Sequence, residues 1–151
     1  MLFRSPYEVT NGIHYGQSTR TLVYVYSDPG RESKSPGAAP VKGQAFIFHS
    51  DRLVSYQYVA NLRDNHTDFD ERKIKQIERG KTTVAQIRQL LGTPSGLAIY
   101  PVIKQTDGHG LTYQYAEMHG FTQSTKKARV IIDASGLVVD VEYTTQGNWG
   151  K

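Results

Sequence analysis

Hydrophobic and polar residues alternate in two separated regions of this chain, and such alternation predicts β-strands. The first region begins with Thr21–Tyr26 and continues with Gln44–Phe48 and Leu53–Tyr58. The last two segments are separated only by the polar residues 49–52, which predicts a β-hairpin. Residues 30–40, rich in Ser, Gly, Pro and charge, predict a long loop before that hairpin.

The second region repeats this order of elements. Leu111–Tyr115 predicts a strand, residues 119–127 a polar loop, and Ala128–Ile132 with Leu137–Tyr143 a second hairpin around the turn at residues 133–136. Because each region reads as strand, loop and hairpin, we interpret the two as an internal duplication of a three-stranded antiparallel meander.

Between the two regions the hydrophobic spacing becomes helical. Asp68 followed three residues later by Glu71 forms a capping-box pattern, and Ile74 and Ile77 share one face of the helix that it predicts. Gly80 suits the end of that helix.

A second helix begins directly after the first. Thr83 and Gln86 form another capping box, and Gly92 and Pro94 end the helix after Leu91. An apolar stripe marks its buried face, made of Val84, Ile87, Leu90 and Leu91.

These elements predict an α+β fold in which the helical hairpin Asp68–Leu91 packs on antiparallel β-meanders, two repeated three-stranded units. The six strands form either one continuous sheet or two sheets with the helices between them. Residues 1–62 would be the first repeat, without helices, and residues 63–151 the helical hairpin with the second repeat, in one compact unit. One helical pair for two meanders leaves a face of the first meander uncovered, and we expect a partner or a second copy to cover it.

Composition excludes several classes of protein. With 151 residues, 38% hydrophobic and 21% charged, the chain suits a globular domain. It contains no cysteine, which removes disulfides, thiol nucleophiles and cysteine-based zinc sites. Residues 1–6 hold no apolar segment of signal-peptide length, so we expect either a chain that is not exported or a signal absent from this sequence.

The net charge of +4 is mild, and its cations gather in two places. They are Arg72, Lys73, Lys75, Arg79, Lys81 and Arg88, and then Lys126, Lys127 and Arg129. Either these groups are solvated surface, or they meet an anionic partner such as nucleic acid, lipid headgroups or an acidic protein.

No residue pattern for catalysis, metal or cofactor binding is complete. Arg79–Thr82 lacks the glycine and the preceding strand of a phosphate-binding loop. Residues 64–70 alternate oxygen ligands as a calcium loop does, but Phe69 replaces the turn glycine and Lys75 the final glutamate. No histidine pair has metal-ligand spacing. We therefore predict a non-enzyme without metal or cofactor.

Residues 79–94 resemble the helical signature of the SmpA/OmlA (BamE) lipoproteins: a glycine, a capping Thr83, an amphipathic helix and the closing segment Leu91-Gly92-Thr93-Pro94. Tyr113, Tyr115 and the hairpin 132–138 fit the strands that follow in that family, so the resemblance covers about residues 70–143. It implies a small cell-envelope binding module with a role in assembly. The lipidated cysteine of the family is absent. The duplicated sheet is also similar in architecture to the β-lactamase-inhibitor proteins.

Tyrosine dominates the predicted strands, and we expect a protein-binding surface there because tyrosine carries many interface hot spots. The candidate residues are Tyr24, Tyr26, Tyr56, Tyr58, Tyr113 and Tyr115. The alternative is that these rings pack in the core beneath the helices.

Three functions remain open at this point. The first is a non-enzymatic protein-binding scaffold of the cell envelope, periplasmic or outer-membrane associated if an upstream signal exists and cytoplasmic otherwise. The second is a proteinaceous enzyme inhibitor with a tyrosine-rich sheet. The third, which the residues favour least, is a cytosolic nucleic-acid binder with the basic helical segment. We expect a protein partner or a homodimer through the first repeat, and membrane association only through a lipid anchor.

Overall fold

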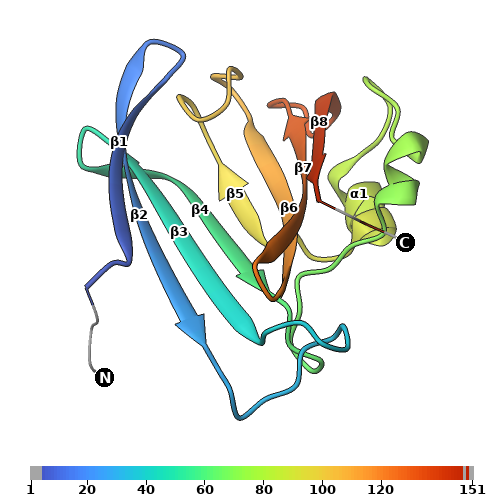
Figure 1. Cartoon of the computed structure of the whole chain (residues 1–151). Coiled ribbons are helices and arrows are strands. Elements are labelled where there is room, and N and C mark those ends of the chain that lie inside the picture. Colours follow the sequence, from blue (N-terminus) through green and yellow to red (C-terminus); the bar gives the residue numbers. More distant parts are fainter. Residues whose placement is uncertain (1–4, 148, 150–151) are drawn as a thin grey trace.

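The computed structural model describes residues 5–147 and 149, which form one curved antiparallel sheet. Its eight strands are β1 (Glu8–His14), β2 (Gln17–Ser27), β3 (Val41–His49), β4 (Arg52–Ala60), β5 (Gly96–Ala98), β6 (His109–His119), β7 (Thr122–Ile132) and β8 (Val138–Gln146). Each strand pairs with the next along the chain, so the order in the sheet is the order in the sequence. The sheet curls into a half-barrel, with β1 and β8 at its two ends (Figure 1).

Two short helices lie between β4 and β5 in the sequence and pack beside the β6–β8 end of the sheet (Figure 1). They are the 3₁₀ helix η1 (Glu71–Gln76) and the α-helix α1 (Val84–Leu91). We call residues 68–94, which contain both helices, the cover. No helix of the described residues is long and apolar enough to span a membrane.

The predicted α+β fold is wrong. The described residues are 53% strand and 10% helical, and they form a single eight-stranded sheet rather than two repeated three-stranded units under a helical hairpin. Two strands were missed. β1 precedes the first predicted strand and is joined to β2 by the turn Tyr15-Gly16, where both φ angles are positive. β5 has three residues, which is too short for periodicity to reveal.

The first predicted helix is also corrected. Residues 71–76 form a 3₁₀ helix capped by Asp70, whose side chain accepts from the Arg72 N–H. The expected cap, Asp68, instead pairs with Lys126 of β7, as does Glu71. Because the buried Lys126 pairs with both acids of the apparent capping box, Asp68 does not cap a regular helix.

The second predicted helix and both hairpins are confirmed. Thr83 caps α1 with a complete capping box involving Gln86, and α1 ends at Leu91 before Gly92. β3 pairs with β4, and β7 pairs with β8. Local chemistry specified these elements because each depends on neighbours in the sequence.

The core has two parts, one on each face of the sheet. On the helix-side face, Ile87 and Leu91 of α1 and Phe69 pack on Leu111 and Val130. On the opposite face, the segment after β5 packs on the sheet through a second cluster, formed by Val54, Ala98, Val102, Ile103 and Ile131. Both clusters depend on β5–β8, so the described core is concentrated toward that end of the molecule.

Candidate functional site

One row of apolar side chains crosses the helix-side face of all eight strands. The strand pairing places the following residues side by side in order: Val9, Leu22, Phe46, Tyr56, Leu97, Leu111, Val130 and Val141. Beneath the cover, Leu111 is 1% exposed and Val130 is 0% exposed. Beyond the cover, Val9 is 46% exposed and Tyr56 is 39% exposed. The same face of one sheet is therefore a core at one end and a surface at the other.

The six tyrosines predicted as binding residues lie on this face, because each is an even number of residues from a member of the row. Two of the six lie beneath the cover and four lie outside it. Tyr113 and Tyr115 are buried, as the core-packing alternative expected. The other four belong to the uncovered end, where Tyr24 and Tyr58 are half-buried and Tyr26 and Tyr56 are exposed.

We call the helix-side face of β1–β4 the open face. Its side chains are Val9, Leu22, Tyr24, Tyr26, Phe46, Phe48, Tyr56 and Tyr58. Tyr24 and Phe46 contact each other edge to face, with ring centroids 6.1 Å apart and an interplanar angle of 77°. This is a preferred aromatic geometry, so the rings are held in place before any ligand arrives.

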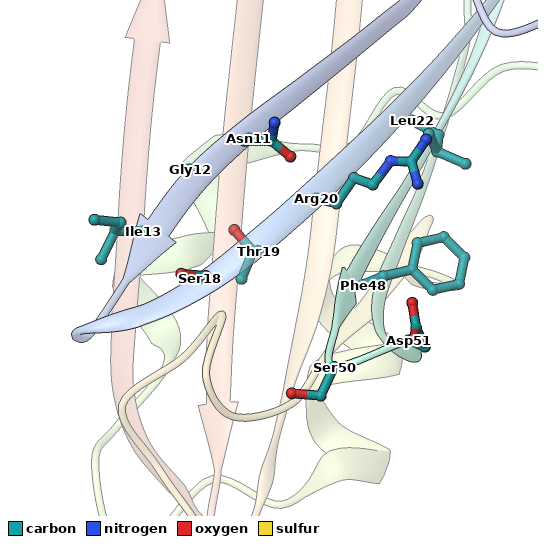
Figure 2. A pocket seen from close by; sticks show the side chains of 10 residues that line it. All are labelled: Asn11, Gly12, Ile13, Ser18, Thr19, Arg20, Leu22, Phe48, Ser50 and Asp51. Atoms are coloured by element: carbon teal, nitrogen blue, oxygen red, sulfur yellow. The ribbon is translucent and has the colours of Figure 1, made fainter.

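The open face is hollowed near the β1–β2 and β3–β4 turns. A hollow of about 720 Å³ is lined by Arg20, Leu22 and Phe48, among others. Figure 2 shows these three side chains gathered on one side of β2 and β3, with the Asp51 carboxylate next to the Phe48 ring. The hollow thus combines an apolar floor with one cation and one anion.

A second hollow, of about 560 Å³, lies at the other end of the open face. Its lining includes Tyr24, Tyr26, Tyr58 and Lys42. Within residues 5–147 and 149, neither Lys42 nor Arg20 of the first hollow forms an ion pair. Sequence reasoning missed both cations, because only the strand pairing shows that they share a face with the aromatic rings.

The covered end is held by a buried lysine. Lys126 of β7, with a side chain 7% exposed, donates to the Phe69 carbonyl and to Glu71 Oε2, each at 2.7 Å. Asp68 Oδ1 also lies 2.7 Å from Lys126 Nζ and forms an ion pair with it. We call this group the lysine clamp. It fastens the start of the cover to the sheet.

Charge balance within the clamp keeps Asp68 and Lys126 ionised. Burial alone would raise the pKa of Asp68, but Lys126 and Lys34 together hold that pKa below its usual value. Burial would likewise lower the pKa of Lys126, and the two carboxylates instead raise it. Each pKa shift is opposite in sign to the effect of burial, so the charges of the clamp compensate one another and its role is structural.

A second polar group ties the loop before β3 to β6. Tyr115 donates its hydroxyl proton to Glu117 Oε1 at 2.8 Å, and Ser35 donates to the same oxygen. His119 lies 3.3 Å from the other carboxylate oxygen of Glu117. His109 lies at the opposite end of β6, so the two histidines that flank this strand do not meet.

Six of the nine cations in the two groups are paired or at least half-buried. Arg72 pairs with Asp70, Arg79 with Asp140 and Lys81 with Glu78. Lys126 is buried in the clamp, and Lys127 and Arg129 are half-buried on the opposite face of β7. The other three, Lys73, Lys75 and Arg88, form no ion pair among the described residues. The small number of unpaired cations weakens the nucleic-acid alternative, which needs free cations along one face.

The described residues contain no group of three or more His, Asp or Glu side chains that could hold a metal ion. No protein-family model, curated protein or solved structure matches this chain. The resemblance to the SmpA/OmlA lipoproteins therefore stays a prediction. The open face is the candidate functional site, on the evidence of its exposure and chemistry.

Proposed function

We propose that this chain is a non-enzymatic protein-binding module and that the open face is its binding surface. The observation that supports this most directly is the apolar row, which is buried at Leu111 and Val130 beneath the cover and is exposed or half-exposed on β1–β4. A contiguous apolar surface of this kind marks a site of interaction in a water-soluble domain.

The composition of the open face suits a protein ligand. Tyrosine and arginine are enriched among interface hot spots, and Tyr56 with Arg20 offers both types. The Tyr24–Phe46 contact restrains two rings in advance, which lowers the entropy lost on binding. Hollows on either side of that contact provide room for side chains of a partner. The cell-envelope location that the resemblance implies stays a prediction.

The test uses two tyrosines with nearly equal exposure. Tyr56 on the open face is 39% exposed, and Tyr143 on β8 is 40% exposed. Tyr56→Ser and Tyr143→Ser variants are used as baits beside the unchanged chain, and captured proteins are identified by mass spectrometry. We expect Tyr56→Ser to lose specific partners and Tyr143→Ser to retain them.

The same variants separate the alternatives. If Tyr56→Ser captures the same proteins as the unchanged chain, the open face is not the binding surface and the proposal is wrong. If salt-dependent oligonucleotide binding is found and Tyr56→Ser abolishes it, the nucleic-acid alternative replaces the proposal. Circular dichroism of both variants excludes unfolding as the cause of a loss.

A further inference from the structure

The two edge strands of the sheet, β1 and β8, differ in whether another segment of the chain pairs with them. At the β8 edge, residues 80–83 of the cover lie alongside the start of the strand, and the Gly80 N–H donates to the Val138 carbonyl at 2.7 Å. The Val138 N–H donates in return to the Thr82 carbonyl at 3.1 Å. At the β1 edge, the described part of the chain places no segment beside the strand. Figure 1 shows β1 at the end of the sheet away from α1.

The β1 edge lacks proline, lysine and bulges, which are common features that block strand pairing. Residues 8–14 contain no proline or lysine, and the pairing of β1 with β2 runs without a bulge. His14 and Gln17 close the two-residue turn Tyr15-Gly16 and so form a hydrogen-bonded pair, which means that the even-numbered residues of β1 direct their backbone groups toward β2. Val9, Asn11 and Ile13 therefore direct their N–H and C=O groups outward.

We propose that the β1 edge pairs with β1 of a second copy of this chain, antiparallel, around a two-fold axis at Asn11. In this register the whole strand is paired, since Glu8 lies opposite His14 of the second copy. The outward backbone groups of Val9, Asn11 and Ile13 then meet those of Ile13, Asn11 and Val9 of the second copy, as hydrogen-bonded antiparallel pairs require.

The side chains of β1 complement one another in this register, which is why the second copy is the preferred occupant. Val9 and Ile13, 46% and 75% exposed, lie opposite each other across the axis and form an apolar pair. On the other face, the Glu8 carboxylate lies opposite the His14 imidazole of the second copy, which can donate a hydrogen bond to it. Asn11 meets its own copy at the axis, where two amides can hydrogen-bond.

The dimer joins the two sheets into one, with both open faces on the same side, because the two-fold axis is perpendicular to the sheet. Each open face stays accessible. This interface uses a strand edge and is independent of the binding function proposed for the face. Tyr56→Ser accordingly leaves the dimer intact, and a failure of either proposal does not decide the other.

Asn11→Pro tests the edge directly. Proline removes the outward N–H of residue 11 but no hydrogen bond to β2, so the fold is retained while pairing between copies is blocked. Asn11→Ala also removes the side-chain amide but keeps the N–H, and it is the matched control. In analytical ultracentrifugation at micromolar concentration we expect a dimer for the unchanged chain and Asn11→Ala. We expect Asn11→Pro to raise the dimer dissociation constant by about tenfold or more relative to Asn11→Ala.

Cysteine cross-linking tests the register, and the absence of native cysteine makes the result unambiguous. Asn11→Cys places two thiols at a hydrogen-bonded pair, where the Cα atoms are about 5.5 Å apart, within the range that a disulfide bridges. Thr10→Cys offsets the thiols and is the control. Rapid oxidative cross-linking of Asn11→Cys alone supports the proposal. A monomeric unchanged chain, an Asn11→Pro variant that dimerises normally, or equal cross-linking of the two cysteine variants would overturn it.

Discussion

The covered and open ends of the helix-side face share one sheet and one apolar row, yet they have opposite solvent exposure. Leu111 and Val130 are buried under α1, while Val9 and Tyr56, on the same row, face solvent. Side-chain type does not explain the difference, because valine occurs at both ends. The difference lies in whether a second layer reaches that part of the sheet.

Simple lengths show why the cover reaches only one end. An α-helix of eight residues is about 12 Å long. Eight strands spaced about 4.8 Å apart extend for about 34 Å. Even if laid across the strands, α1 spans only two or three of them. Within the part of the chain that the structure describes, α1 therefore leaves the helix-side face of β1–β4 without a helical layer.

The largest expected effect comes from releasing the cover. Lys126→Met leaves Asp68 and Glu71 without their shared cation, and breaking a buried ion pair of this kind costs about 3 kcal/mol of the free energy of unfolding. Lys42→Met on the open face is the matched control, with an expected change within about 0.5 kcal/mol. Urea denaturation of both variants measures the difference. Equal losses would show that the clamp does not hold the covered end.

A smaller effect compares the two ends of the row with one kind of substitution. Val130→Ala removes two methyl groups from a fully buried site and should destabilise the fold by about 2 kcal/mol. Val9→Ala, at a site 46% exposed, should change stability by about 0.5 kcal/mol or less. Thermal and urea unfolding report both values. A similar cost at the two sites would mean that the open end is already covered in solution.

The smallest expected effect concerns a tyrosine beneath the cover. Burial raises the pKa of Tyr113 to about 12, although the Arg88 charge opposes this, and its hydroxyl donates to the Gly92 carbonyl at 2.9 Å. Since the folded pKa lies above the unfolded value near 10, this stabilisation is complete below pH 10 and is lost as the pH rises through 12.

Tyr113→Phe removes that hydrogen bond and should cost about 1 kcal/mol at neutral pH. The difference in stability between the unchanged chain and the variant should then shrink between pH 10 and 12, which urea titrations at several pH values would show. Tyr56→Phe on the open face is the control. A difference that does not depend on pH would contradict the buried state of Tyr113.

Parts of the fold and of the candidate site were predictable from sequence because they rest on local chemistry. The capping box of Thr83 and Gln86 and the β3–β4 hairpin are examples. The four open-face tyrosines were identified, and so was the shortage of helical cover for the first strands. The separation of these tyrosines from Tyr113 and Tyr115 was not predictable, because it depends on where the cover docks.

The sequence by itself determined the strand periodicity, the well-capped helix α1 and the absence of cysteine chemistry. The tertiary structure decided that Lys126 captures Asp68 and Glu71, which turned an apparent capping box into an ion-pair anchor. It also decided which half of one apolar row is core. The physical reason is that periodicity specifies the face on which a side chain lies, whereas burial requires a second layer to pack over that face.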